Sequence, residues 1–243
     1  MITSIKQVRF YPTIALLLLI VNIIGFGPTY FFKPVIESPE LPFRTHIHGI
    51  IFTCWLVLFA LQAFLVRNRN IKMHRFWGRV GGFLALAMIL SALQILYYRA
   101  LEFDGSQASL QNTALVVCGN IVLLMLFALN VGLGIQFRRN PAWHKRFMLL
   151  ACIAMMPQSL GRIGKMPVNP LINGLPNEVF FGLGGMLLLI IILWTHDLFR
   201  TRKIHPVSGI GGPVILVAII LAAVVLPKSE FIWDIIIWLN KLA

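Results

Sequence analysis

Long apolar stretches alternate with short polar turns along almost the whole chain. Each stretch holds about 20 mostly apolar residues, the length that an α-helix needs to cross the hydrocarbon core of a bilayer. The stretches cover residues 11–32, 45–66, 76–98, 112–137, 146–162, 178–199 and 206–226. This pattern predicts an all-α fold, a polytopic membrane helical bundle of about seven transmembrane helices in a single integral membrane domain.

Proline and glycine mark the places where these helices are expected to be irregular. Pro157 predicts a kink in the fifth helix, and the run Gly211–Pro213 predicts a broken or kinked start of the seventh. The tail after Pro227, SEFIWDIIIWLNKLA, has two interpretations. Residues 229–242 either form an amphipathic helix in the membrane interface or extend the seventh helix.

The composition agrees with a membrane protein and argues against two other classes. Hydrophobic residues make up 58% of the chain and charged residues 12%, whereas soluble domains have about 25% charged residues. The net charge of +13 is divided among short turns and is not gathered on one face with base-reading residues, so nucleic acid is not an expected partner. The three cysteines all lie in apolar stretches and give no disulfide framework.

The basic residues alternate from one side of the predicted bundle to the other. Because short cytoplasmic loops carry an excess of Lys and Arg, the N-terminus is predicted inside and the C-terminus outside. The acidic residues follow the opposite bias, and Asp197 is the only one expected inside. The cations on the predicted inner side are Lys6, Arg9, Arg67, Arg69, Lys72, Arg75, Arg138, Arg139, Lys145, Arg146, Arg200, Arg202 and Lys203.

An internal helical-hairpin repeat places histidines in equivalent local settings. The segment LFALQAFLVRNRNIKMHR (58–75) parallels LFALNVGLGIQFRRNPAWHKR (126–146), and LWTHDLFRTRKIHP (193–206) is a weaker third copy. Each unit is an apolar helix, a basic inner turn and a histidine that opens the next helix. His74, His144 and His205 are therefore expected at one depth, where they either bind a common group or are simply interfacial residues.

Haem b is the cofactor that these residues favour. Imidazole pairs from different helices suit a bis-histidine haem, and inner carboxylates are too scarce for a carboxylate-bridged metal site. His74 and His144 are the candidate iron ligands, with His205 or His46 as substitutes. His46 and His48 are expected on the outer side, and residues two apart on a helix point about 200° away from each other. Both can therefore serve one centre only in a non-helical lead-in.

Arg79 is the candidate charge partner at the inner side. It lies inside the third apolar stretch, near His74. Arginines at this depth pair with an anion or extend to the interface. A haem propionate, a lipid phosphate and Asp197 are the anions expected for Arg79.

The segments HIHGIIFTCWLVLFALQ, MHRFWGRVGG and WHKRFMLLACIAMMPQSLGR give the chain a family resemblance. The chain resembles a group of uncharacterised bacterial multi-span membrane proteins with a domain of unknown function, which implies the bacterial cytoplasmic (inner) membrane. It is more weakly similar to haem-oxidase assembly proteins and transmembrane b-type cytochromes. Those carriers pair histidines on both membrane sides, whereas only His46 and His48 are expected outside here, so a second haem is not predicted.

Three functions are consistent with the sequence. The first is haem b or metal binding by the inner histidines, with a role in electron transfer or respiratory-complex biogenesis and a respiratory or redox membrane partner. The second is a membrane enzyme acting on a lipid or isoprenoid. The third is a non-catalytic transporter or scaffold with interfacial histidines. Colour in the purified protein distinguishes the first from the others, and retained metal without colour favours the second.

Overall fold

A computed structural model describes residues 7–32, 40–166 and 177–241 of the chain. Within these ranges every regular element is a helix. In chain order the elements are α1 (Gln7–Phe26), the π-helical turn η1 (Gly27–Phe31), α2 (Phe43–Arg67), α3 (Ile71–Leu101), α4 (Gln107–Gln136), α5 (Pro141–Gly164), α6 (Asn177–Thr201), α7 (Pro206–Val224), the 3-10 turn η2 (Leu226–Lys228) and α8 (Glu230–Lys241).

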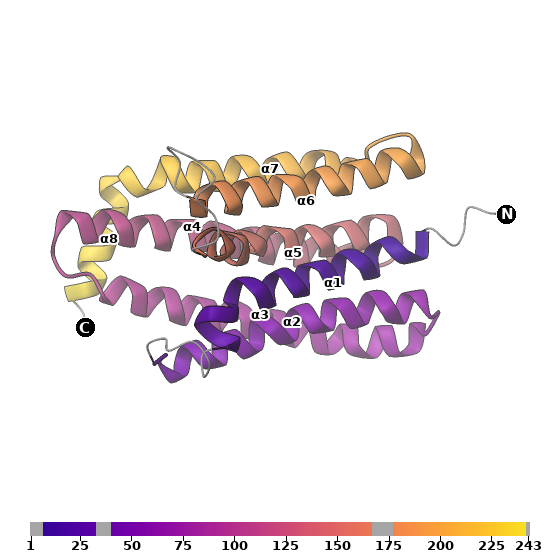
Figure 1. Ribbon diagram of the computed structural model, residues 1–243, viewed down its shortest axis with the longest axis horizontal. Coiled ribbons are helices and arrows are strands. Elements are labelled where there is room, and N and C mark those ends of the chain that lie inside the picture. The colour runs from indigo at the N-terminus through magenta and orange to yellow at the C-terminus, as the bar shows by residue number, and fades with distance from the viewer. Residues whose placement is uncertain (1–6, 33–39, 167–176, 242–243) are drawn as a thin grey trace.

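Seven of the described helices are long and apolar enough to cross a membrane. They run side by side along the long axis of the molecule, and the short helix α8 crosses one end of the bundle (Figure 1). The predicted all-α class and the number of spanning helices are confirmed. The chain is a multi-pass membrane protein whose surroundings are a lipid bilayer.

The main departures from the expected boundaries are at the starts of α3, α4 and α5. Each helix begins five residues before the apolar stretch that predicted it. Asn70 caps α3 by accepting the Met73 N–H at 3.1 Å, and Asn140 caps α5 by accepting the Ala142 N–H at 3.1 Å. A side-chain cap starts a helix wherever it satisfies the first free N–H groups, even among polar residues.

The C-terminal part resolves two further expectations. Helix α7 continues through Gly211 and Pro213, so the helix is not broken there, and the alternative of a kinked start stays a prediction. A separate helix, α8, follows η2, and the tail therefore does not simply extend α7. Residue 242, the last of the predicted interfacial segment, lies outside the described residues, and the placement of α8 in the membrane interface stays a prediction.

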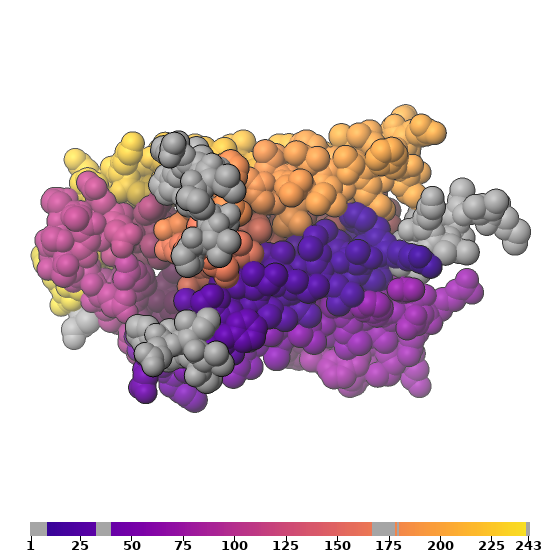
Figure 2. All heavy atoms as spheres, viewed as in Figure 1, coloured from indigo at the N-terminus to yellow at the C-terminus, as the bar shows by residue number. Residues whose placement is uncertain are grey.

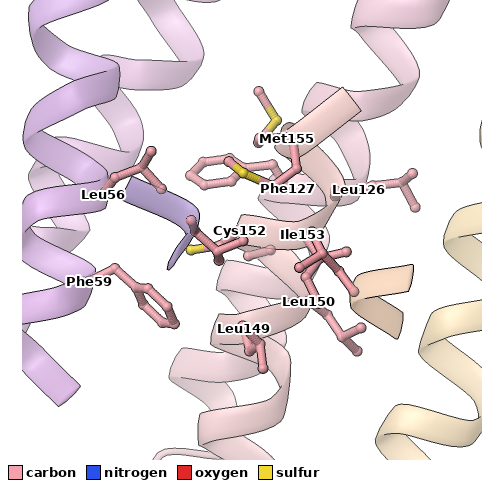
Figure 3. Close-up of a cluster of buried hydrophobic side chains, with 14 of the residues drawn as sticks. Leu56, Phe59, Leu126, Phe127, Leu149, Leu150, Cys152, Ile153 and Met155 are labelled. Carbon is pink, nitrogen blue, oxygen red and sulfur yellow. The ribbon is translucent and has the colours of Figure 1, made fainter. Parts of the chain in front are cut away.

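Helix α5 is the central element of the bundle. It contacts α1, α4, α6 and α7, and the residues from Leu149 to Met156 are all buried. Figure 3 shows several of these side chains in one cluster with Leu56 and Phe59 of α2 and Phe127 of α4. On the other side, α1 approaches so closely that a Cβ at Gly25 would collide with the Ser159 carbonyl of α5. Such close packing replaces the hydrophobic effect as the force between helices in a membrane.

The three basic turns lie together at one end of the molecule. The turns α2–α3, α4–α5 and α6–α7 are gathered at the end where α1 begins, on the right of Figure 1. We call this the basic end. Figure 2 shows α1 lying between α2 and α6 as it runs from that end. The basic end is where the repeat-related histidines are located, and its assignment to the inner side of the membrane stays a prediction.

Candidate functional site

His74 and His144 lie against each other at the basic end. Their ring centroids are 6.2 Å apart, and the ring planes are nearly perpendicular, at 85°. His74 is in the first turn of α3 and His144 in the first turn of α5, each four residues after its capping asparagine. The equivalent caps place the two residues of the repeat at the same depth, and the packing of the two hairpins brings the rings together.

The proton position on His144 is set by a backbone carbonyl. Its Nδ1 lies 2.7 Å from the carbonyl oxygen of Gly134 in α4. Since a carbonyl only accepts, Nδ1 donates, and the Nε2 of the neutral ring is left with a free lone pair. A second hydrogen bond of this kind is the usual way in which proteins orient a metal-binding histidine. His144 is therefore prepared to act as a ligand through Nε2.

The proton position on His74 is set by Gln62 of α2, and it is the opposite one. The Gln62 amide oxygen accepts the Gly78 N–H at 2.9 Å, so its nitrogen faces the His74 carbonyl at 3.1 Å and the His74 ring Nδ1. In this orientation Nδ1 accepts, and the neutral ring carries its proton on Nε2. His74 can offer an Nε2 lone pair to a metal only after the Gln62 amide turns over and gives up its two backbone contacts.

The donors around the pair fit a haem iron better than a bare metal ion. Among the residues that the structure describes, no three His, Cys, Asp or Glu side chains are close enough to hold a metal ion together. Protein-bound zinc takes three or four such ligands. A haem iron needs only two from the protein, which His144 and, after the amide rotation, His74 would supply.

His205 takes no part in this pair, although it belongs to the third copy of the repeat. It is the N-cap of α7, where its Nδ1 accepts the Val207 N–H at 3.2 Å. Its ring packs edge-on against Trp143, with centroids 5.8 Å apart. Burial lowers the pKa of His205 from its usual 6.5, and the nearby positive charge of Arg146 lowers it further. His205 is thus neutral at pH 7 and serves as a helix cap.

The main polar centre that the sequence did not predict is a buried ion pair between α5 and α6. The Arg146 side chain is 3% exposed and the Asp197 side chain 0%. The guanidinium donates to the carboxylate from Nε, at 3.1 and 3.2 Å, and from Nη2. Asp197 also accepts the Ser208 hydroxyl at 2.6 Å and the His205 backbone N–H at 3.2 Å. This network joins α5, α6 and α7.

The ion pair corrects two expectations. Arg146 was counted among the turn cations, but the early start of α5 places it inside the helix. Arg79, which was expected to reach an anion such as Asp197, is exposed and forms no ion pair with any described carboxylate. His196 stacks on Phe10 with centroids 3.8 Å apart, and its Nδ1, 3.6 Å from Asp197, is too far for a hydrogen bond.

His46 and His48 are located at the opposite end of the bundle. Both lie within α2, where residues two apart diverge, so the structure does not bring them to one centre. The His48 Nδ1 lies 3.1 Å from the Ser91 hydroxyl of α3, which itself donates to the Met88 carbonyl. The Tyr30 hydroxyl donates to the His46 carbonyl at 3.1 Å. These contacts fasten α2 to its neighbours.

The geometry of the six histidines thus divides them into a facing pair, a helix cap, a stacked ring and two residues at the far end. Comparisons with protein-family models, with curated proteins and with solved structures found no match to the chain.

Proposed function

We propose that this multi-pass membrane protein binds haem b between His74 and His144 at the basic end, and that it acts in electron transfer or respiratory-complex biogenesis. The observation that supports the proposal is the 6.2 Å separation of the two ring centroids. Nitrogen ligands lie about 2 Å from a metal, so two rings at this separation would both be within reach of one haem iron. Residues 70 positions apart in the sequence reach this spacing.

The residues around the pair have separate roles in the proposal. His144, oriented by the Gly134 carbonyl, is the ligand that needs no rearrangement, and His74 becomes the second ligand when Gln62 turns over. Arg79 is exposed on α3, but it comes five residues after His74 and therefore points about 140° away from it, so only its long side chain would let it reach a propionate. The haem supplies one-electron oxidation and reduction when bound, and the protein supplies its position and electrostatic surroundings.

The test is a visible spectrum of the protein purified in mild detergent after expression with haem supplied. We expect a Soret band that changes on reduction and that is lost in His74→Ala and in His144→Ala. His48→Ala is the matched control, because it removes a histidine at the opposite end and should leave the spectrum unchanged. Metal analysis on the same sample measures the iron that accompanies the band.

The other outcomes separate the two alternatives. Retained metal without a Soret band would favour a membrane enzyme that acts on a lipid or isoprenoid. A colourless, metal-free protein would overturn the haem proposal and favour a transporter or scaffold. The Gly134 carbonyl and the Gln62 amide support this last candidate, because they give both rings protein partners in the absence of any metal.

A further inference from the structure

The basic end carries exposed cations that no carboxylate in the described part of the chain balances. The ion pairs of the described residues involve other side chains, and the nearby Asp197 is bound by Arg146. We call this set the basic rim. It consists of Arg67 at the end of α2, Arg69 in the α2–α3 turn, Lys72 and Arg75 at the start of α3, Arg138 and Arg139 in the α4–α5 turn, and Arg202 and Lys203 in the α6–α7 turn.

Two members of the basic rim have a backbone conformation that arginine rarely adopts. Arg69 has φ 57° and Arg202 has φ 60°, the left-handed region in which a Cβ crowds the backbone. In the described ranges no other non-glycine residue has a positive φ. Both residues follow the last turn of a helix, α2 for Arg69 and α6 for Arg202.

The α2–α3 turn shows why arginine is an unfavourable choice there. The Arg69 N–H donates to the Val66 carbonyl at 3.0 Å, and the Asn70 N–H donates to the Leu65 carbonyl at 2.9 Å. This pair of bonds is the Schellman motif, whose left-handed position is usually glycine and sometimes asparagine. The residues before and after the left-handed position, 68 and 70, are asparagines, but the left-handed position itself is an arginine. Folding alone does not account for that choice.

Membrane orientation does not account for it either. The positive-inside rule depends on the number of cations in a loop and not on the position of each one within it. An unusual residue held in a strained conformation instead indicates a contact that depends on that residue. A guanidinium matches the geometry of phosphate with paired donors.

The neighbours of the two arginines identify the source of the phosphate. Exposed apolar side chains flank both: Val66 and Ile71 next to Arg69, and Phe199, 90% exposed, and Ile204 next to Arg202. Such side chains are stable in lipid and unfavourable in water. We propose that the basic rim binds the phosphate groups of anionic lipids in the leaflet that it faces, with Arg69 and Arg202 as contact residues.

The test compares two double variants that remove the same charge. The variant Arg69→Gly/Arg202→Gly replaces the two arginines that have a left-handed backbone. The control Arg138→Gly/Arg139→Gly replaces two arginines whose φ is ordinary. The full chain is titrated with phosphatidylglycerol and with phosphatidylcholine, and bound lipids are counted by native mass spectrometry. Thermal unfolding is followed in parallel in phosphatidylcholine nanodiscs.

The wild type should prefer phosphatidylglycerol. One cation near an anionic surface contributes about fivefold to the affinity, so both double variants should bind phosphatidylglycerol more weakly. The affinity of the Arg69/Arg202 variant should fall at least several-fold more than that of the control. The same variant should unfold at a higher temperature than the wild type in phosphatidylcholine, since glycine relieves the backbone, whereas the control should not. A gain in stability with a loss of lipid binding separates the contact from an effect on folding.

Three results would overturn the proposal. Equal affinity losses in the two double variants would mean that Arg69 and Arg202 are not contact residues. If the wild type showed no preference for phosphatidylglycerol, the basic rim would not be a binding surface for anionic lipids. Displacement of the lipid by inorganic phosphate at constant ionic strength would reassign the rim to a soluble anion. None of these results depends on whether the protein binds haem.

Discussion

The α4–α5 and α6–α7 turns belong to the same repeat, yet their histidines have different structural roles. In the α4–α5 turn the helix starts at Asn140–Pro141, so His144 lies four residues inside the helix and faces His74. In the α6–α7 turn the proline directly follows His205, so this histidine is itself the cap. Proline favours the first helical position and keeps the residue before it out of the helix. The comparison shows that the start of the helix, set by proline, decides what a repeated histidine can contact.

The largest effect is expected on the α6–α7 side, where the polar groups are structural. Asp197→Ala leaves the buried Arg146 charge without its partner, and breaking one member of such a pair costs about 3–5 kcal/mol. The free energy of unfolding measured in detergent should fall by this amount. The double variant Arg146→Met/Asp197→Leu, which removes both charges, should recover most of the loss. Wild-type stability in the single variant would show that the network is not structural.

An intermediate effect is expected on the facing pair. Gln62→Leu removes the amide that fixes the proton of His74 on Nε2, so that Nδ1 can carry it and Nε2 is free for a metal. Turning the amide over costs two backbone hydrogen bonds of about 0.5–1.5 kcal/mol each. Haem titration should therefore show about tenfold tighter binding in the variant. Weaker binding would mean that Gln62 supports the ligand form of His74 and that the assigned proton position is wrong.

A smaller effect is expected from the cap. His205→Ala removes the acceptor for the Val207 N–H, and loss of an N-cap costs about 1 kcal/mol. His205→Asn is the matched control, because asparagine is among the best N-cap residues and should retain wild-type stability. Thermal unfolding of the three proteins measures the difference. A Soret band, if present, should be the same in all of them, since His205 does not face the pair.

The smallest effect is the pH dependence of that cap. Since burial and Arg146 hold the folded-state pKa of His205 below its usual 6.5, the unfolded chain takes up the proton first as the pH falls. The stabilisation by the neutral ring is present above pH 6.5 and is lost as the pH falls through the folded-state pKa. Wild type and His205→Asn should thus have the same unfolding temperature at pH 8, and the wild type should have the lower one below pH 6.5. Parallel curves across this range would contradict the role of the neutral ring.

Much of the fold could be predicted because single residues and local patterns determine it. Hydrophobicity located all seven spanning helices, and the asparagines at 70 and 140 are caps visible in the sequence. The early starts of α3, α4 and α5 were missed because the apolar pattern indicates where a helix is buried and not where a side chain caps it. For the same reason Arg146 was expected at the very start of the fifth helix, among the cations of the turn. A buried Asp197 in an apolar helix requires a partner, and correct helix starts would have pointed to Arg146.

The sequence by itself determined the number of spanning helices, the end of the bundle that is basic, and the end at which the histidines of the repeat lie. These properties depend on composition and local spacing. Only the tertiary structure decided that His74 meets His144 while His205 does not, that Gln62 and Gly134 give the two rings opposite proton positions, and that Asp197 binds Arg146 and not Arg79. These contacts join different helices. They depend on how the helices pack and rotate against one another, which local sequence does not specify.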